Sequence, residues 1–161
     1  MDYSWWVFLH ILGAFAFAFG HGASGLAAFR IRATRDPAQV RLLLDLSSMA
    51  LGVTYVGLLL LLVGGIAAGI AGNHFARGWI WAAIVILVVI IVAMYAMATP
   101  FYGRLRVAAG ARAKDKKVDP NPVVTQADID TLAASNRPAV LLAIGTIGFL
   151  LILWLMVIKP F

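Results

Sequence analysis

The sequence predicts an all-α fold, a transmembrane four-helix bundle, because of its composition and the length of its apolar runs. Of the 161 residues, 63% are hydrophobic and 12% are charged, whereas an ordinary soluble domain carries about 25% charged residues. A soluble domain of this size would leave much of that apolar surface in water. Four long stretches contain no Asp, Glu, Lys or Arg: 3–29, 46–76, 78–103 and 138–158.

Each stretch is long enough to cross a bilayer as a helix, which takes roughly 20 apolar residues. All four are too long for the strands of a membrane barrel, which have about 10 residues. We therefore predict a single domain that covers residues 1–161. The four spans are expected at about 4–29, 47–72, 78–100 and 138–158, with a cytoplasmic loop over 104–137.

The basic residues predict the orientation of these spans. Arg77 and Lys159 stand apart from the other eleven Lys and Arg residues, which occupy two segments between apolar runs. Because basic residues concentrate on the cytoplasmic side of membrane proteins, we expect both termini on the non-cytoplasmic side of a bacterial inner membrane. The eleven residues are Arg30, Arg32, Arg35, Arg41, Arg104, Arg106, Arg112, Lys114, Lys116, Lys117 and Arg137.

The same charges argue against nucleic acid as a partner, although the net charge is +6. They lie between apolar runs rather than on one soluble face, so anionic lipid headgroups are their expected neighbours. The chain has no Cys, which excludes disulfides and thiolate metal sites. All five Trp residues fall near the predicted outer interface, where amphipathic rings are favoured: Trp5, Trp6, Trp79, Trp81 and Trp154.

Small residues in the first span predict close helix packing. They recur in steps of three and four, so they share one helix face, and small residues let membrane helices approach each other closely. We expect this face to point into the bundle. Its members are Gly13, Ala16, Gly20, Ala23 and Ala27.

Local signals predict where several helices begin and end. Asp36 before Pro37 is typical of a helix start, and the short loop 73–77 indicates that the second and third helices form an antiparallel hairpin. The third span should end near Thr99-Pro100.

Thr125 and Asp128 resemble a capping box that opens a short helix. Arg41 and Asp45, four residues apart, are expected to pair at the membrane surface.

Two His residues in the first span are the candidates for chemistry. His10 and His21 are eleven residues apart, which places them on nearly the same helix face, about 16 Å apart at ~1.5 Å per residue. Ionisable residues inside a membrane are uncommon and often functional. Each His could bind haem b or, as a metal ligand, copper. Three Met residues could supply second ligands: Met94 and Met97 at the depth of His21, and Met156 at the depth of His10.

A simpler interpretation stays open for the same residues. Each His would donate one hydrogen bond to a carbonyl or a Ser on a neighbouring helix, and the Met residues would be packing. His74, in the outer loop, is expected to be solvated. Tyr55, Thr54 and Tyr95 could line a small polar pocket near His21.

Three short motifs carry a resemblance to a known family. They are His10-Ile11-Leu12-Gly13, Arg30-Ile31-Arg32 and the terminal Met156-Val157-Ile158-Lys159-Pro160. Through them nearly the whole chain resembles a bacterial family of small predicted integral membrane proteins of unassigned function. The first span is also similar, more loosely, to copper-resistance-type and haem-carrying four-helix membrane proteins. The chain departs from the haem-carrying pattern because its second, third and fourth spans contain no His.

Three functions remain open after the sequence alone. The first is a haem or copper site in electron transfer, in which a homodimer could supply His10 from each subunit. The second is a structural or accessory subunit of a larger membrane complex. The third is a small transporter, although the spans lack the charged residues of an ion relay. A hydrolase is not indicated, because the chain has no Cys and no Gly-x-Ser-x-Gly motif.

Overall fold

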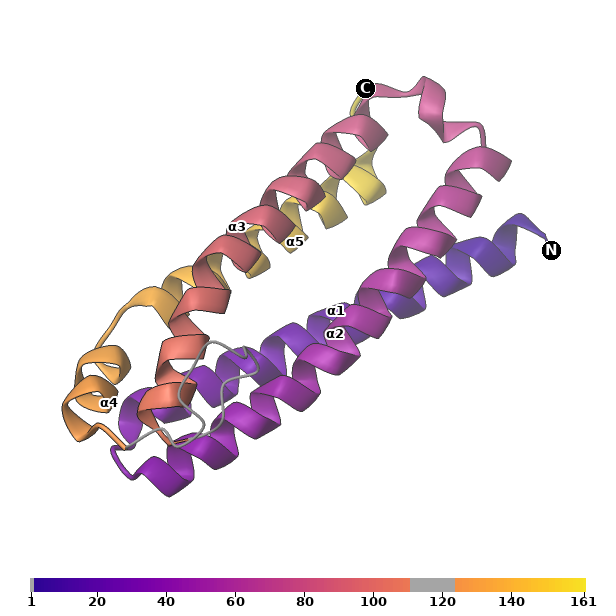
Figure 1. Ribbon diagram of the computed structural model, residues 1–161. Helices are drawn as coiled ribbons and strands as arrows, with labels where there is room; N and C mark the ends of the chain where they lie inside the picture. Colours follow the sequence, from indigo (N-terminus) through magenta and orange to yellow (C-terminus); the bar gives the residue numbers. More distant parts are fainter. Residues whose placement is uncertain (1, 111–123) are drawn as a thin grey trace.

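The computed structural model describes residues 2–110 and 124–161, and Figure 1 shows their arrangement. Four of the basic residues that predict a cytoplasmic loop lie outside the described residues: Arg112, Lys114, Lys116 and Lys117. All elements of the described part are helical. They are α1 (Tyr3–Ala33), α2 (Pro37–Ala71), the 3-10 helix η1 (His74–Ala76), α3 (Gly78–Ala108), α4 (Gln126–Ala133) and α5 (Arg137–Ile158).

The described part contains four helices that are long and apolar enough to cross a membrane. This confirms the predicted all-α bundle. The lipid bilayer is therefore the surroundings in which the many exposed apolar side chains are stable, such as Phe15 and Phe19, which are more than two-thirds exposed.

The helices are arranged as two pairs, α1 with α2 and α3 with α5 (Figure 1). The pairs meet at one end of the molecule, where α4 and the turn between α1 and α2 lie. We call this the basic end. They diverge toward the other end, the open end, where η1 and both termini lie (Figure 1). The predicted packing of α2 against α3 as a hairpin is wrong, because the two helices are joined through η1 but barely touch.

Glycine explains why α2 packs against α1 instead. A Cβ atom built at Gly13 would lie 2.7 Å from the Gly57 carbonyl oxygen, and one at Gly20 would lie 2.7 Å from the Ala50 oxygen. From the α2 side, a Cβ at Gly57 would lie 2.9 Å from the carbonyl carbon of Ala16. These backbones approach more closely than any larger side chain would permit. Ala27 of the same stripe is buried, and Ala23 is half-buried.

Helix boundaries follow local chemistry with one difference. Asp36 caps α2 by accepting a hydrogen bond from the Ala38 backbone N–H at 3.1 Å, and α4 begins directly after Thr125. Helix α3, however, continues through Pro100 to Ala108 and does not end with the predicted span. A proline costs a helix one backbone hydrogen bond, and here the turns on both sides remain helical.

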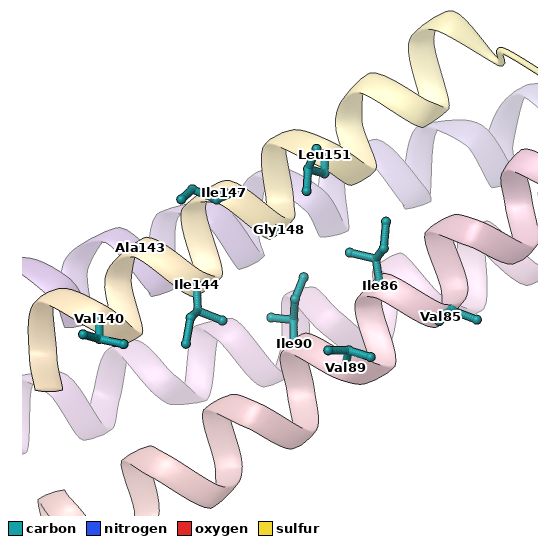
Figure 2. Close-up of a pocket in the computed structure, with 10 residues that line it drawn as sticks. All are labelled: Val85, Ile86, Val89, Ile90, Val140, Ala143, Ile144, Ile147, Gly148 and Leu151. Atoms are coloured by element: carbon teal, nitrogen blue, oxygen red, sulfur yellow. The ribbon is translucent and has the colours of Figure 1, made fainter.

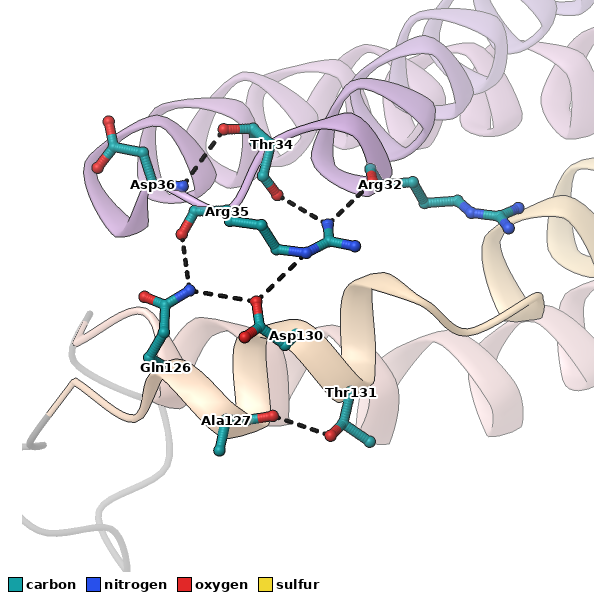
Figure 3. A network of polar contacts seen from close by, with 8 residues as sticks. All are labelled: Arg32, Thr34, Arg35, Asp36, Gln126, Ala127, Asp130 and Thr131. Carbon is teal, nitrogen blue, oxygen red and sulfur yellow. Dashed lines mark hydrogen bonds and ion pairs between the residues drawn. The ribbon is translucent and has the colours of Figure 1, made fainter.

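Polar contacts join the two helix pairs at the basic end (Figure 3). The Arg35 guanidinium contacts the Asp130 carboxylate at 3.2 Å, and the Gln126 side chain donates to the Arg35 carbonyl at 3.0 Å. Arg32 donates to the Asn136 side chain at 3.1 Å. Beneath these contacts lies an apolar cluster contributed by α1, α2, α3 and α4: Ile31, Val40, Leu44, Leu105, Ala108, Ala109 and Ile129.

A second polar contact at this end corrects a sequence prediction. Asp45 binds Arg106 of α3 at 2.7 Å instead of Arg41, one turn away on its own helix. Arg106 also donates to the Ser48 hydroxyl at 2.7 Å and to the Leu44 carbonyl at 3.0 Å. A guanidinium with several donors satisfies these three acceptors together, so Arg106 ties α3 to α2 where the pairs converge.

The glycine contacts predict a matched pair of variants. Gly13→Ala should lower the free energy of unfolding by about 1–3 kcal/mol, because overpacking forces α1 away from α2. Gly22→Ala should be neutral or slightly stabilising, because no described atom lies within 4 Å of a Cβ at that position. Thermal unfolding in detergent, followed by circular dichroism, measures both. Equal stabilities of the two variants would contradict this packing.

The orientation in the membrane is still a prediction from charge, and the absence of Cys makes it simple to test. A single Cys at Asn73, at the open end, should react with a membrane-impermeant maleimide added to intact cells. A single Cys at Ala127, in α4, should react only after the cells are opened. Both positions are exposed. The reverse labelling pattern would place the open end in the cytoplasm.

Candidate functional site

A large cleft lies between the two helix pairs in the open half of the molecule. Its volume is about 580 Å³, which falls in the range of roughly 300–1,000 Å³ that is usual for ligand and cofactor sites. All four long helices and η1 contribute to its walls. Most of the lining is apolar, with side chains such as Leu58, Leu62, Leu87, Phe149 and Ile152.

His10 places an imidazole in the wall of this cleft. Its Nδ1 lies 2.8 Å from the Leu61 carbonyl oxygen, and because a carbonyl only accepts, Nδ1 carries the proton. The Nδ1 edge of the ring rests on Gly65, where a Cβ would lie 2.7 Å from that nitrogen. In a neutral imidazole the other nitrogen, Nε2, then has a free lone pair. A backbone carbonyl that holds Nδ1–H is the usual support for a metal-binding His.

His21 lies outside the cleft and faces a different helix. Its ring stacks on Phe17 at a centroid distance of 6.2 Å and sits against Gly145 of α5. Its Nε2 is buried and has no hydrogen-bond partner among the described residues, and the Leu142 backbone is a hydrogen-bond partner of the ring. Phe17 in turn stacks on Phe149. The two His residues thus lie on one helix but not in one site.

The three candidate Met ligands are also divided. Met156 lines the cleft with His10 and packs against the apolar cluster around Trp79 and Leu155. Met94 and Met97 are half-buried on α3, closer to the basic end, and are not among the residues that line the cleft. The structure therefore brings one predicted His–Met combination to the same cavity.

Within the described part of the chain, Tyr55, Thr54 and Tyr95 form neither a polar pocket near His21 nor the interhelical hydrogen bonds that are the simpler expectation for them. Tyr55 and Tyr95 are 65% and 72% exposed, so both rings face the lipid. The Thr54 hydroxyl bonds within its own helix, to the Ala50 carbonyl at 3.0 Å. Helix spacing alone did not reveal which face of α2 and α3 would be covered.

The mouth of the cleft, at the open end, carries a cluster of polar side chains, of which the sequence assigns only Trp79 to the outer interface. The Tyr3 hydroxyl lies 3.2 Å from Nε2 of His74, and the His74 ring centroid lies 5.7 Å from that of Trp79. The Lys159 ammonium lies 5.8 Å from the centre of the Trp79 ring. We call Tyr3, His74, Trp79 and Lys159 the mouth cluster; all four line the cleft.

Burial lowers the pKa of His74 below its ordinary value of 6.5, and the positive charges of Lys159 and Arg77 act in the same direction. Because its pKa is lowered, His74 is mainly neutral at pH 7. The loop His is half-buried, because η1 places its ring beside the rings of Tyr3 of α1 and Trp79 of α3.

A second hollow lies between α3 and α5 and has a different character (Figure 2). Its volume is about 480 Å³. The labelled side chains around it are aliphatic and come from the two helices alone, with Gly148 opposite Ile90 (Figure 2). A groove without polar groups offers nothing to orient a ligand, and acyl chains of the bilayer are its natural contents.

Metal binding by a cluster of carboxylates and imidazoles is not supported in the described part of the chain. No group of three or more His, Asp or Glu side chains comes together there. Among the His residues, His10 and His74 line the cleft and His21 lies outside it.

Comparison with known proteins identifies the family of the chain. Residues 5–160 match the family described as "Predicted integral membrane protein (DUF2269)". The chain belongs to this family. The match confirms the resemblance drawn from the sequence motifs and covers nearly the whole bundle. No curated protein and no solved structure matches the chain.

The lowered pKa of His74 predicts a pH effect on stability. Below about pH 6.5 the unfolded chain binds a proton at this residue more readily than the folded protein does. Neutral His74 therefore makes its full contribution to the free energy of unfolding above that pH, and the contribution is lost as the pH falls. Between about pH 7.5 and about pH 5, the melting temperature of the wild type should fall further than that of His74→Gln. Parallel pH profiles for the two proteins would contradict this assignment.

Proposed function

We propose that the protein binds haem b in the open cleft, with His10 as an axial ligand, and acts in electron transfer. The observation that carries the proposal is the state of His10. Its Nδ1–H is held by the Leu61 carbonyl, which leaves Nε2 as the ligating atom in a cavity of cofactor size. Haem bound there would supply one-electron redox chemistry.

The lining of the cleft suits a large, flat, apolar group. Apart from His10 and the mouth cluster, the lining residues are almost all aliphatic or aromatic. Burial in such surroundings would hold a macrocycle by its apolar area and exclude water from the iron. Met156, on α5, is the residue of this chain that offers a second axial ligand from the facing helix pair. Ligation from one chain would make a second copy of His10 unnecessary.

Copper(I) is the alternative occupant, because imidazole and thioether are both acceptable to it. A single copper ion, however, would bind the two side chains His10 and Met156 and would not fill a cavity of about 580 Å³. The volume therefore favours haem over copper. The same Nδ1–H bond also fits the simpler interpretation, in which His10 joins α1 to α2 in an accessory subunit, and bound haem distinguishes the two functions.

The absorption spectrum of the purified protein, made with haem precursor supplied, tests the proposal. The wild type should show a Soret band with reducible α and β bands. His10→Leu should lose at least about nine-tenths of the bound haem, since the axial bond is lost. The matched control is His21→Leu, on the same helix but outside the cleft, and it should keep the haem.

Two results would contradict the proposal. One is a colourless wild type after haem is supplied. The other is a coloured protein in which His21→Leu loses the haem and His10→Leu retains it. A colourless protein with stoichiometric copper that depends on His10 would select the alternative occupant.

A further inference from the structure

The mouth of the cleft contains two buried side-chain nitrogens that have no hydrogen-bond partner among the described residues. Nε1 of Trp79 is buried and has no hydrogen-bond partner among the described residues, although the Trp79 side chain is only 3% exposed. Nδ1 of His74 is also buried and also has no hydrogen-bond partner among the described residues. Buried indole and imidazole nitrogens nearly always have partners in folded proteins, so two unpaired nitrogens on one cavity point to a partner that comes from outside the chain.

The charge at the mouth indicates the kind of partner. Lys159 lines the cleft and holds its ammonium over the Trp79 ring, and the structure describes no carboxylate paired with it. When the Tyr3 hydroxyl donates to Nε2 of neutral His74, Nδ1 carries the proton and becomes a donor. Indole N–H, imidazole N–H and ammonium are then three donors around one end of an apolar cavity.

The backbone at Lys159 supports a functional position for this cation. Lys159 has φ 50° and ψ 58°, a left-handed conformation, which costs a residue with a side chain roughly 1 kcal/mol or more. This conformation ends α5 and turns the chain back, so that the Trp79 backbone N–H reaches the Phe161 carbonyl at 3.3 Å. A left-handed residue is a common way to end a helix, and here it places the Lys159 side chain over Trp79 at the mouth.

We propose that the mouth cluster binds a carboxylate at the polar end of an amphipathic ligand whose apolar body fills the cleft. Trp79, His74 and Lys159 are the donors, and the carboxylate supplies the acceptors that they lack. This inference rests on the proposed function for haem as the apolar body, whose propionates would be the carboxylates. A fatty acid offers the same chemistry, and the experiment separates the two sources.

The experiment compares acids with their esters in the full-length protein. In detergent, wild type, Lys159→Gln and Trp79→Phe are titrated with haem b and with haem b dimethyl ester, which lacks the charges. Each variant should weaken haem b binding by about tenfold, as expected for a charge-assisted hydrogen bond, and should leave dimethyl ester binding unchanged. Arg77→Gln is the matched control, because it removes a neighbouring positive charge that does not line the cleft.

A second probe needs no haem. In lipid nanodiscs, electron paramagnetic resonance measures how much of a spin-labelled stearic acid, or of its methyl ester, is immobilised by the protein. If haem fails to bind but the acid is immobilised, and the two variants reduce that fraction, the carboxylate site stands and the haem proposal falls. If haem binds but neither variant separates acid from ester with either probe, the carboxylate site is overturned. Failure of every ligand to bind overturns both.

Discussion

The close approach of α1 and α2 is the contact on which the rest of the structure depends. Gly13 and Gly20 of α1 lie against backbone atoms of α2. Gly57 of α2 lies against backbone atoms of α1 in the same way. Apolar side chains gain little by leaving lipid for one another, so association in a bilayer depends on contacts of this kind. Because the small residues of α1 and α2 pack against each other, α2 makes few contacts with α3.

The cleft is a direct consequence of this unequal packing. The α3–α5 pair is tied to the α1–α2 pair mainly at the basic end, through Arg106, Arg35 and the apolar cluster beneath them. Toward the open end the pairs diverge (Figure 1), and the walls of the resulting space are apolar. Apolar walls that enclose a cavity without filling it lose packing energy, which a bound apolar group would restore.

Within this cleft, hydrogen bonds decide which polar groups can act. The Leu61 carbonyl accepts a hydrogen bond from Nδ1 of His10 and so leaves Nε2 with a free lone pair in a neutral ring. At the mouth, Trp79 and His74 each have a side-chain nitrogen without a hydrogen-bond partner in the described part of the chain, and Lys159 lies beside Trp79. An imidazole in an apolar cavity with polar groups at the rim is the arrangement on which the proposed amphipathic ligand rests. His21 forms a backbone hydrogen bond with Leu142 but is not among the residues that line the cleft.

The sequence by itself determined the class of the protein, its four helices and its family. Those conclusions follow from run length, composition and short motifs, which act locally and need no knowledge of neighbours. It also identified His10, Met156 and the small residues of α1 as notable. The tertiary structure alone decided which helices pair, that Asp45 binds Arg106 rather than Arg41, and that His10 and not His21 lines a cavity. Helix periodicity defines a face, but what that face meets depends on the packing of distant segments, so the mouth cluster could be assembled only by the fold.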